Sequence, residues 1–386
     1  MKRKCKYKNF DRDVLVIGGD HYNALGVIRS LGELGIKPYY IMISNEKICP
    51  TASSKYIKKV FRFDENDEKG LLEFLIEKFY TKEKAFIIPT GDPIEVFLDS
   101  NLNQLKEKYI IPNINSKQGE IIKHMDKMYQ KELCEKNNIN YAKSFYIDLD
   151  NYMKYIDILP YKVIIKPDVS AEGSKSDILI EEGKENIIKG LQKFKEKKYK
   201  RVMVQEFLNY DMEYGLMGIS FGNTVIIPGI NSNDYIYPFK RGNTSYSEMF
   251  PISDFDFNID NITELVKSLN YVGLFEIEIF KVKDKIYFSE MNFRNSANLY
   301  AYSGNNINYI YIYLLLCLNL DISQEKVTVD KHYYFCVEPL HLKNVKEGVI
   351  SFGKCLAHIK NSTKLIFNKR DIKPFIIKIF HAICKK

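Results

Sequence analysis

The 386-residue chain lacks the features that would place it in or across a membrane or in an oxidising compartment. No apolar run approaches the roughly 18 residues of a spanning helix, and the opening MKRKCKYKNFDRD is too polar for a secretion leader. The seven cysteines are scattered without a CxxC pair. This pattern favours free thiols over a zinc site or a disulfide framework. We therefore expect a cytoplasmic protein.

Further absences narrow the chemistry. His21, His124, His332 and His341 show no metal spacing, and the cysteines lack the partner pattern of nucleophilic catalysis. The turn GGDHYNALG does not match GxGxxG, which disfavours an oxidoreductase. Lys and Arg exceed Asp and Glu by 57 to 49, a net charge of +8 that is compatible with an anionic ligand such as a nucleotide or with an acidic membrane surface. Because the lysines are spread evenly, we interpret the excess first as composition bias and expect no nucleic-acid binding.

The first 115 residues alternate strand and helix patterns, which predicts an α/β domain of the doubly wound type. The apolar run Val14–Ile17 is followed by a Gly-rich turn and a helical pattern, as in a βαβ unit. Ligands of such sheets bind at the carboxyl ends of the strands. Gly18–Asn23 and Thr90–Asp92 therefore lie on the expected ligand edge. Asp20 and Asn23 are also suited to cap a helix, which is the interpretation that we favour.

The middle of the chain carries two lysines of interest. Residues 120–140 predict one polar amphipathic helix, in which Lys127 is one lysine among many. The apolar strand Val163–Ile165 ends in Lys166, and a loop of small residues, Asp168–Ser176, follows it. Such a loop can fold over phosphates through its backbone N–H groups. Lys166 is the more specific signal, because a lysine that ends an apolar strand contributes little to packing.

The composition of two later segments predicts their structure. Residues 231–248 are rich in Asn, Tyr, Ser and Gly, which predicts a long ligand-facing loop. The ending PFIIKIFHAICKK is basic and apolar. It predicts a terminal helix that packs on the protein, which is the favoured interpretation, or an amphipathic helix that lies on a membrane.

The stretch FEIEIFKVKDKIYFSEMNFR predicts a β-hairpin, because two runs of alternating apolar residues flank a charged turn. The first run carries Glu276 and Glu278, and the second carries Glu290, Asn292 and Arg294 on one face. Converging carboxylate and amide oxygens suit Mg²⁺, and an arginine beside them suits an anionic transition state. A half-exposed hairpin with a polar outer face is the alternative.

This order of features resembles the ATP-grasp superfamily of carboxylate–amine ligases. The resemblance covers roughly residues 13–310, and it is most specific at Glu290, Asn292 and Arg294, which match the usual E-x-N-x-R arrangement. It implies a mixed α/β and α+β architecture, an ATP-grasp fold behind an N-terminal parallel sheet. The expected units are an N-terminal domain of residues 1–115, an ATP-grasp domain of residues 116–320 and a C-terminal extension of residues 321–386.

The resemblance also implies a site for ATP and Mg²⁺, with two ions expected and Mn²⁺ as an alternative. The expected metal ligands are Glu278, favoured over Glu276 by the family pattern, with Glu290 and Asn292. Arg294 would bind the acyl phosphate. Gln205 to Leu208 would line the adenine, with Glu206 at its amino edge and Glu213 at the ribose. The expected nucleotide-binding residues are Lys127, Lys166, Gly173, Ser174, Gln205, Glu206, Phe207, Leu208 and Glu213, and the expected catalytic residues are Arg294 and Lys166.

Two departures from the family pattern stand out. Phe293 replaces the usual proline, and the phosphate loop has a single glycine, Gly173. Within the superfamily the chain resembles most the D-aspartate-ligase-like and envelope-polysaccharide group, partly through DIKPF in its tail.

The implied function is ADP-forming ligation of a small carboxylate to a small amine through an acyl phosphate, in the biosynthesis of envelope or capsular polysaccharide precursors. A soluble dipeptide or metabolite ligase and a nucleotide-binding protein without turnover remain as alternatives. Homodimerisation and peripheral contact with the inner face of the membrane are further expectations.

Overall fold

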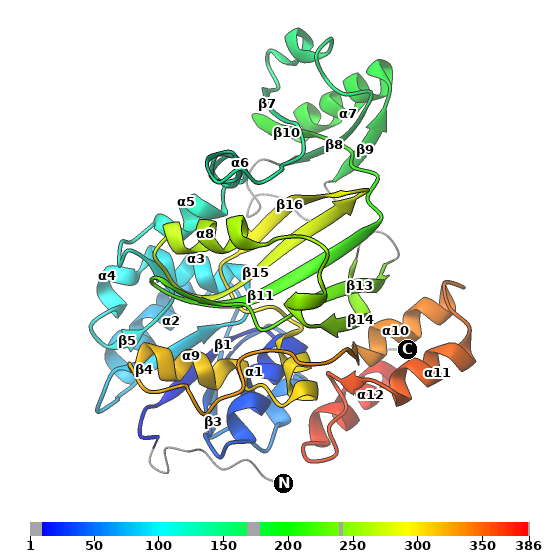
Figure 1. Cartoon of the computed structure of the whole chain (residues 1–386). Helices are drawn as coiled ribbons and strands as arrows, with labels where there is room; N and C mark the ends of the chain where they lie inside the picture. Colours follow the sequence, from blue (N-terminus) through cyan, green and yellow to red (C-terminus); the bar gives the residue numbers. More distant parts are fainter. Residues whose placement is uncertain (1–9, 168–177, 239–241, 385–386) are drawn as a thin grey trace.

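The computed structural model describes residues 10–167, 178–238 and 242–384. Figure 1 shows a parallel sheet at the base of the molecule, a long antiparallel sheet across the middle and a small sheet at the top. The strands are β1 Val14–Gly18, β2 Tyr39–Ile43, β3 Lys59–Phe63, β4 Ala85–Pro89, β5 Tyr109–Ile110, β6 Asn113–Ile114, β7 Ser144–Asp148, β8 Lys162–Pro167, β9 Leu179–Glu182, β10 Arg201–Glu206, β11 Met212–Phe221, β12 Thr224–Ile226, β13 Ile230–Tyr237, β14 Asn243–Phe250, β15 Tyr271–Val282, β16 Lys285–Asn292, β17 Tyr333–Cys336 and β18 Thr363–Lys364. The helices are α1 Tyr22–Gly32, α2 Glu68–Glu73, α3 Asp92–Ser100, α4 Leu102–Leu105, α5 Glu120–Met125, α6 Lys127–Lys136, α7 Lys184–Glu196, α8 Asp260–Ser268, α9 Tyr309–Cys317, α10 Glu338–Lys346, α11 Phe352–Lys360 and α12 Lys373–Cys384.

The N-terminal sheet is parallel throughout, in the order β3-β2-β1-β4-β5. Strands β1 and β4 are apolar and buried along their whole length, as expected for parallel strands covered on both faces. The strand order reverses between β1 and β4, so their carboxyl ends, near Gly18 and Thr90, form the switch point where ligands of such sheets bind. The prediction of a parallel N-terminal sheet is confirmed, and the expected ligand edge lies at this switch point.

The small sheet is antiparallel, in the order β7-β10-β8-β9, and α7 covers one face of it. Its core joins Ile187, Leu191 and Phe194 of the helix to buried valines and isoleucines of the strands. Alternation along β8 buries Val163 and Ile165 in this core and leaves Lys166 on the opposite face.

The large sheet runs β16-β15-β11-β13-β14-β17-β18, with β6 and β12 paired at its side. The predicted hairpin is confirmed as β15 and β16, and Glu278 lies opposite Glu290 while Glu276 lies opposite Asn292. The register shifts immediately after the Glu278–Glu290 pair. Bulges of this kind re-aim side chains and recur next to functional sites.

Two predicted elements are wrong. Residues 120–140 do not form one helix, because Asp126 breaks the run and its carboxylate caps α6 by accepting hydrogen bonds from the backbone N–H groups of Met128 and Tyr129. Residues 231–248 do not form a long loop, since most of them belong to the paired strands β13 and β14. The Asn and Ser residues that suggested a loop share these strands with Ile, Tyr, Thr and Phe, which favour strands.

The C-terminal extension adds to the same structure. Strands β17 and β18 extend the large sheet beyond β14, and α12 packs on the short helix Pro50–Ser53 of the N-terminal region. A buried ion pair between Arg29 of α1 and Asp371 joins the two regions. Among the described residues, no helix is both long enough and apolar enough to span a membrane.

Candidate functional site

The hairpin face brings several carboxylates close together. Glu278 is half-buried, and its enclosure by the protein, followed by the charges of Glu290 and Glu213, raises its pKa well above the ordinary value. Glu290 lies opposite it in the register, and Asn292 follows on the same strand. Like charges held this close destabilise one another unless a cation lies between them. The donor set therefore fits a hard divalent ion.

Glu276 differs from Glu278 although both lie on the same face of β15. Its carboxylate accepts hydrogen bonds from the Arg294 guanidinium, at 3.2 Å, and from the Ser296 hydroxyl. Glu276 is therefore committed to internal partners, whereas Glu278 faces Glu290. The geometry agrees with the choice of Glu278 over Glu276 as a metal ligand, a choice that remains a prediction.

No three His, Cys, Asp or Glu side chains form a potential metal-binding group within residues 10–167, 178–238 and 242–384. A magnesium ion held here would therefore take Glu278, Glu290 and the Asn292 amide and would complete its shell with phosphate and water oxygens. Such incomplete protein coordination is usual for Mg²⁺ at nucleotide sites.

Two lysines lie beside these carboxylates. The Nζ atom of Lys127 lies 3.9 Å from Glu290 Oε2, and Lys127 is the first residue of α6, directly after its Asp126 cap. Burial, then the nearby charge of Lys127, lowers the pKa of Lys166 to about 7, against the opposite influence of Glu290 and Glu278. A bound polyphosphate would relieve this repulsion between the lysines. Strongly perturbed pKa values of this kind cluster at functional sites.

Gln205 positions Lys166. Its side-chain oxygen accepts a hydrogen bond from Lys166 Nζ at 3.0 Å, and its amide nitrogen donates to Ser144 Oγ at 2.9 Å. The amide is therefore engaged with the lysine, and the predicted contact of Gln205 with adenine stays a prediction. Glu206 is exposed at the end of β10, and Phe207 and Leu208 continue from it half-buried.

Of three other predicted nucleotide contacts, only Glu213 lies within the described residues. Glu213 lies on β11, and its Oε1 accepts a hydrogen bond from the Asn233 amide at 2.6 Å. Its charge contributes to the raised pKa of Glu278, which places it close to the hairpin face. Gly173 and Ser174 lie outside the described residues.

Arg294 connects the hairpin to the N-terminal sheet. Its Nε donates to Asp92 Oδ1 at 2.9 Å, at the start of α3, and its Nη1 donates to Glu276. Burial opposes the charge of Arg294, but Asp92 and Glu276 outweigh it and hold the pKa above the ordinary value. The guanidinium is thus fixed as a cation at the junction of the two sheets.

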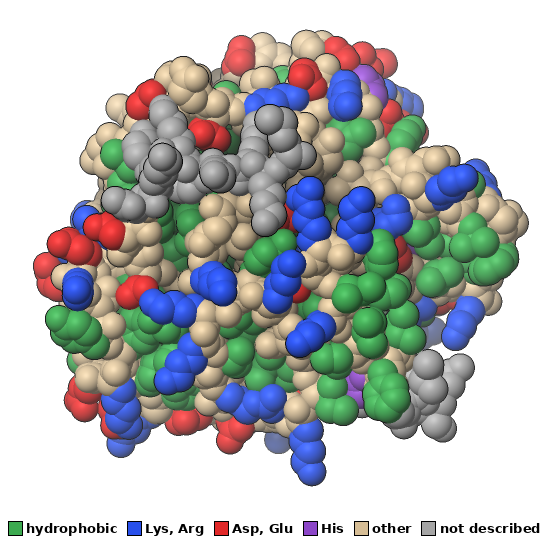
Figure 2. Space-filling model, turned by 90° about the horizontal axis from the view of Figure 1, so that it is seen from below, with side chains coloured by type: hydrophobic (Ala, Val, Ile, Leu, Met, Phe, Trp, Pro, Cys, Tyr) green, Lys and Arg blue, Asp and Glu red, His purple; other side chains and the backbone are tan. Residues whose placement is uncertain are grey.

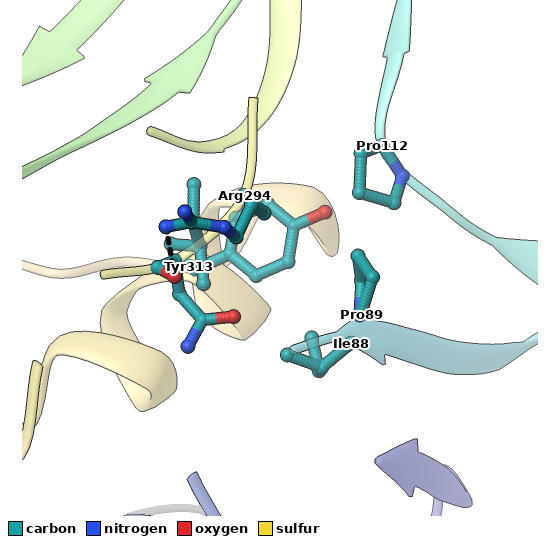
Figure 3. A pocket seen from close by; sticks show the side chains of 7 residues that line it. Ile88, Pro89, Pro112, Arg294 and Tyr313 are labelled. Atoms are coloured by element: carbon teal, nitrogen blue, oxygen red, sulfur yellow. Dashed lines mark hydrogen bonds between the residues drawn. The ribbon is translucent and has the colours of Figure 1, made fainter. Parts of the chain in front are cut away.

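A small cavity lies along this junction. It is lined by Ile88, Pro89, Pro112, Leu274, Arg294, Asn295 and Tyr313, which come from both sides of the seam. In the view of Figure 3, the guanidinium of Arg294 points away from Pro89 and Pro112. The cavity is too small for a substrate, so a ligand would reach Arg294 from the carboxylate-lined side of the hairpin.

Asn23 and Asn295 meet at the switch point of the N-terminal sheet, a contact not predicted from the sequence. Asn23 is buried, and its amide nitrogen donates to the backbone oxygens of Thr90 and Asn295. The favoured capping role is wrong, because His21 is the N-cap residue of α1, and Asp20 instead accepts a hydrogen bond from the Thr51 backbone. No local pattern connects positions 23 and 295, which meet only through the fold.

This arrangement matches a known domain. The family profile described as "ATP-grasp domain" matches residues 132–298, which include Lys166, Gln205, Glu213 and the whole hairpin. The predicted ATP-grasp domain is confirmed for these residues. The predictions of an ATP-grasp ligase with ATP and Mg²⁺ as its cofactors are thereby confirmed.

The similarity extends beyond the ATP-grasp domain. The chain is 26% identical over 321 residues to formate-dependent phosphoribosylglycinamide formyltransferase of Prochlorococcus marinus (strain AS9601), covering 76% of this chain and 77% of that protein. A second such enzyme, from strain MIT 9515, is 23% identical over 371 residues and covers 90% of each chain. These relatives do not belong to the D-aspartate-ligase-like envelope group, so they do not support the predicted subgroup.

Solved structures show the same fold. The N5-carboxyaminoimidazole synthetase of Staphylococcus aureus superposes with a TM-score of 0.65 at 14% identity, covering 91% of this chain and 88% of that chain. The L-amino acid ligase of Bacillus licheniformis gives 0.64 at 13% identity, covering 87% and 85%. The biotin carboxylase domain of Hydrogenobacter thermophilus 2-oxoglutarate carboxylase, in complex with MgADP, gives 0.66 at 15% identity, covering 85% and 75%. The ATP-grasp fold predicted from the sequence is confirmed.

Proposed function

We propose that this ATP-grasp chain uses ATP to activate a carboxylate as an acyl phosphate and joins the acyl group to an amine. One observation carries the proposal. The Glu278–Glu290 pair lies beside Lys127 and Lys166, two lysines that could bind phosphate. Arg294 is held as a cation at the edge of the same face. Metal-type carboxylates, anion-binding lysines and a fixed guanidinium are the groups that acyl phosphate chemistry requires.

The proposed reaction has two steps, formation of an acyl phosphate and transfer of the acyl group to the amine. In the first, a carboxylate oxygen attacks the γ-phosphorus of ATP, the bond to the β-phosphate oxygen breaks, and ADP leaves. Lys127 and Lys166 neutralise phosphate oxygens, and bound Mg²⁺ would supply further charge neutralisation. In the second, the amine nitrogen attacks the acyl carbon, the bond to phosphate breaks and the nitrogen loses a proton. Arg294 stabilises the negative charge of both acyl species.

The first substrates to test follow from the relatives. The curated relatives use formate and phosphoribosylglycinamide by their names. We therefore propose a small carboxylate such as formate as donor and a small amine such as a glycinamide as acceptor. A dipeptide-forming activity is a second candidate, since an L-amino acid ligase has the same fold. An envelope precursor as the acceptor and a homodimer as the active form are proposals that rest on the sequence patterns alone.

The test is substrate-dependent phosphate release. Purified chain is incubated with ATP, Mg²⁺ and paired carboxylates and amines, and products are identified by mass spectrometry. Release that requires both substrates, with one new amide per phosphate, supports the proposal. Binding of ATP without phosphate release for any pair would favour a nucleotide-binding protein without turnover.

The metal assignment is tested with the same assay. We expect Glu290→Ala to abolish substrate-dependent ADP release, because Glu290 would help to hold the Mg²⁺ that neutralises phosphate charge. Normal turnover of this variant would overturn the assignment of Glu290.

A further inference from the structure

The net positive charge of the chain is concentrated in its last 49 residues. Residues 338–386 contain eleven Lys and Arg and three Asp and Glu, an excess of eight, which equals the net charge of the whole chain. Residues 1–337 are therefore neutral overall, with 46 basic and 46 acidic side chains. The interpretation of the charge as an evenly spread composition bias is wrong in this respect.

Two of the three acidic groups of this segment are turned inward, and the third, Glu347, is exposed. Glu338 and Asp371 are buried and accept internal hydrogen bonds, the former from Ile366 and Phe367 and the latter from Arg29, Ser54 and Lys55. The basic side chains are mostly exposed, and none of those that are exposed and described forms an ion pair with another described residue. The exposed basic residues are Lys343, Lys346, Lys354, Lys360, Lys369, Arg370 and Lys373.

Helix α12 packs on the protein through Pro374 and Phe375, yet it also exposes a row of apolar side chains. Ile376, Ile379 and Phe380 are 53%, 45% and 63% exposed, and they share one face at helical spacing with Ile372, which precedes the helix. Lys378 lies on the other side, enclosed by protein, and this burial lowers its pKa despite the nearby charge of Asp20. The helix thus directs apolar side chains to solvent and a lysine inward.

Helix α11 adds to the exposed apolar surface. Phe352 and Leu356, one turn apart on it, are 59% and 47% exposed. Figure 2 looks onto the underside of the molecule and shows hydrophobic side chains gathered over the C-terminal helices, with Lys and Arg side chains beside them. We call the exposed apolar residues of α11 and α12, together with their exposed basic neighbours, the basic-apolar face.

We propose that the basic-apolar face docks this chain on an anionic lipid membrane. Lipid headgroups of negative charge attract the exposed lysines, and the apolar side chains of an interfacial helix enter the headgroup–acyl boundary. This mode is peripheral, in keeping with the absence of a spanning helix among the described residues. The proposal concerns where the chain works and stands independently of the ligase function.

Other occupants fit the face less well. A second copy of the chain would bring two strongly basic surfaces together, and like charges oppose such an interface. A nucleic acid would match the lysines but would leave Ile376, Ile379 and Phe380 without an apolar partner, because nucleic-acid backbones are bound through charge and hydrogen bonds. An anionic bilayer satisfies both the charge and the apolar side chains.

Vesicle co-sedimentation tests the proposal. Full-length chain is mixed with vesicles of phosphatidylcholine alone and of phosphatidylcholine with phosphatidylglycerol. We expect binding to the anionic vesicles only, and we expect high salt to weaken it. The variant Ile376→Glu/Phe380→Glu, and separately Lys369→Glu/Arg370→Glu/Lys373→Glu, should each lower the partition coefficient at least about tenfold, since each charge near the surface contributes on the order of a kilocalorie per mole.

Matched controls use exposed residues of other regions. Ile158→Glu changes an isoleucine that is 55% exposed, and Lys189→Glu/Lys193→Glu changes exposed lysines of α7. These variants should bind vesicles like the unchanged chain. Since all substituted side chains are exposed, unchanged thermal unfolding identifies variants that are folded.

Three results would overturn the proposal. One is absence of binding, or equal binding to neutral vesicles. Another is equal loss of binding in the control variants. The third is reassignment of the face to a different partner: either concentration-dependent dimerisation that Ile376→Glu/Phe380→Glu removes, with no vesicle binding, or RNA binding that the charge reversals remove and the apolar substitutions leave intact.

Discussion

Two sets of enclosed charges in this chain have opposite character. Arg29 and Asp371 are 0% and 1% exposed in their side chains, and they form an ion pair with N–O distance 3.1 Å. Arg29 also donates to the backbone oxygens of Leu365, Ile366 and Asp371, and Ser54 and the Lys55 backbone donate to the carboxylate. At the hairpin, by contrast, Glu278 lies among Glu290 and Glu213, and burial and their charges raise its pKa.

The paired charges of Arg29 and Asp371 and the neighbouring carboxylates around Glu278 suggest different roles, one in folding and one in ligand binding. A buried pair whose hydrogen bonds are satisfied holds elements together, and breaking it leaves an uncompensated charge. At the hairpin, burial and the neighbouring carboxylates still raise the pKa of Glu278 although Lys127 lies 3.9 Å from Glu290, and such perturbed groups cluster at functional sites. We therefore expect the Arg29–Asp371 pair to contribute to folding, and we propose that the Glu278 group contributes to ligand binding. Substitutions at the two places should affect different measurements.

The largest effect is expected at Glu278. We predict that Glu278→Gln lowers turnover at least about a thousandfold, because a catalytic metal stabilises the transition state by several kcal/mol. Its thermal unfolding temperature should stay the same or rise, since repulsion with Glu290 is removed. Steady-state phosphate release and thermal unfolding measure the two quantities.

Glu276→Gln is the matched control for Glu278→Gln, because both residues lie on the same face of β15. It should lower kcat through a displaced Arg294 while the Mg²⁺ concentration for half-maximal activity stays unchanged. If Glu276→Gln raised that concentration and Glu278→Gln did not, the two roles would have to be exchanged.

The next effect is on stability. We predict that Asp371→Asn destabilises the chain by about 3–5 kcal/mol, because it leaves the buried Arg29 guanidinium without its counter-charge. Urea unfolding followed by circular dichroism measures this loss. Arg370→Met, at the exposed neighbouring position, should leave the unfolding midpoint unchanged. An Asp371→Asn midpoint equal to that of the unchanged chain would show that the pair is dispensable for folding.

A smaller, pH-dependent effect is expected at Lys166. Its pKa is about 7 in the free protein, so the lysine loses its charge as the pH rises through 7. Bound phosphates favour the charged form and raise this pKa, so ATP binding takes up a proton above pH 7. The Kd for ATP should therefore rise with pH between 7 and the higher pKa of the complex, by at most about tenfold per pH unit.

Calorimetry in buffers of different ionisation enthalpy measures that proton uptake. In Lys166→Met only the titration of ATP itself and of other groups should remain, so the difference between the two proteins isolates the lysine. Identical proton uptake in both would contradict the role of Lys166.

The sequence predicted well what depends on local pattern. The alternation of FEIEIF and IYFSEMNF determined the hairpin and its facing glutamates, and the apolar runs of β1 and β4 determined a buried parallel sheet. These features follow from the periods of strand and helix. Composition misled where polar residues lie in strands, as at β13 and β14, whose Asn and Ser side chains bond one another across the pair.

Long-range contacts were beyond the reach of the sequence. Asn23 meets Asn295 only because the N-terminal sheet docks against the end of the hairpin, and Arg294 is held by Asp92 from the same docking. Neither pairing leaves a trace in local spacing. The same holds for Gln205, whose engagement with Lys166 depends on the antiparallel register of β8 and β10.

The smallest effect is expected at Asp126, which would act on ATP binding only through the position of Lys127. Asp126 is not among the predicted ATP or Mg²⁺ ligands, yet its side chain caps α6 and so positions Lys127 in the first turn. Asp126→Ala should cost about 1 kcal/mol of stability, as the loss of an N-cap does. It should also raise the KM for ATP severalfold with little change in kcat, because Lys127 then samples more orientations.

Asp67→Ala, which removes the cap of α2 in the N-terminal domain, should cost similar stability and leave the KM unchanged. Equal KM values in the two variants would show that Lys127 does not depend on its cap.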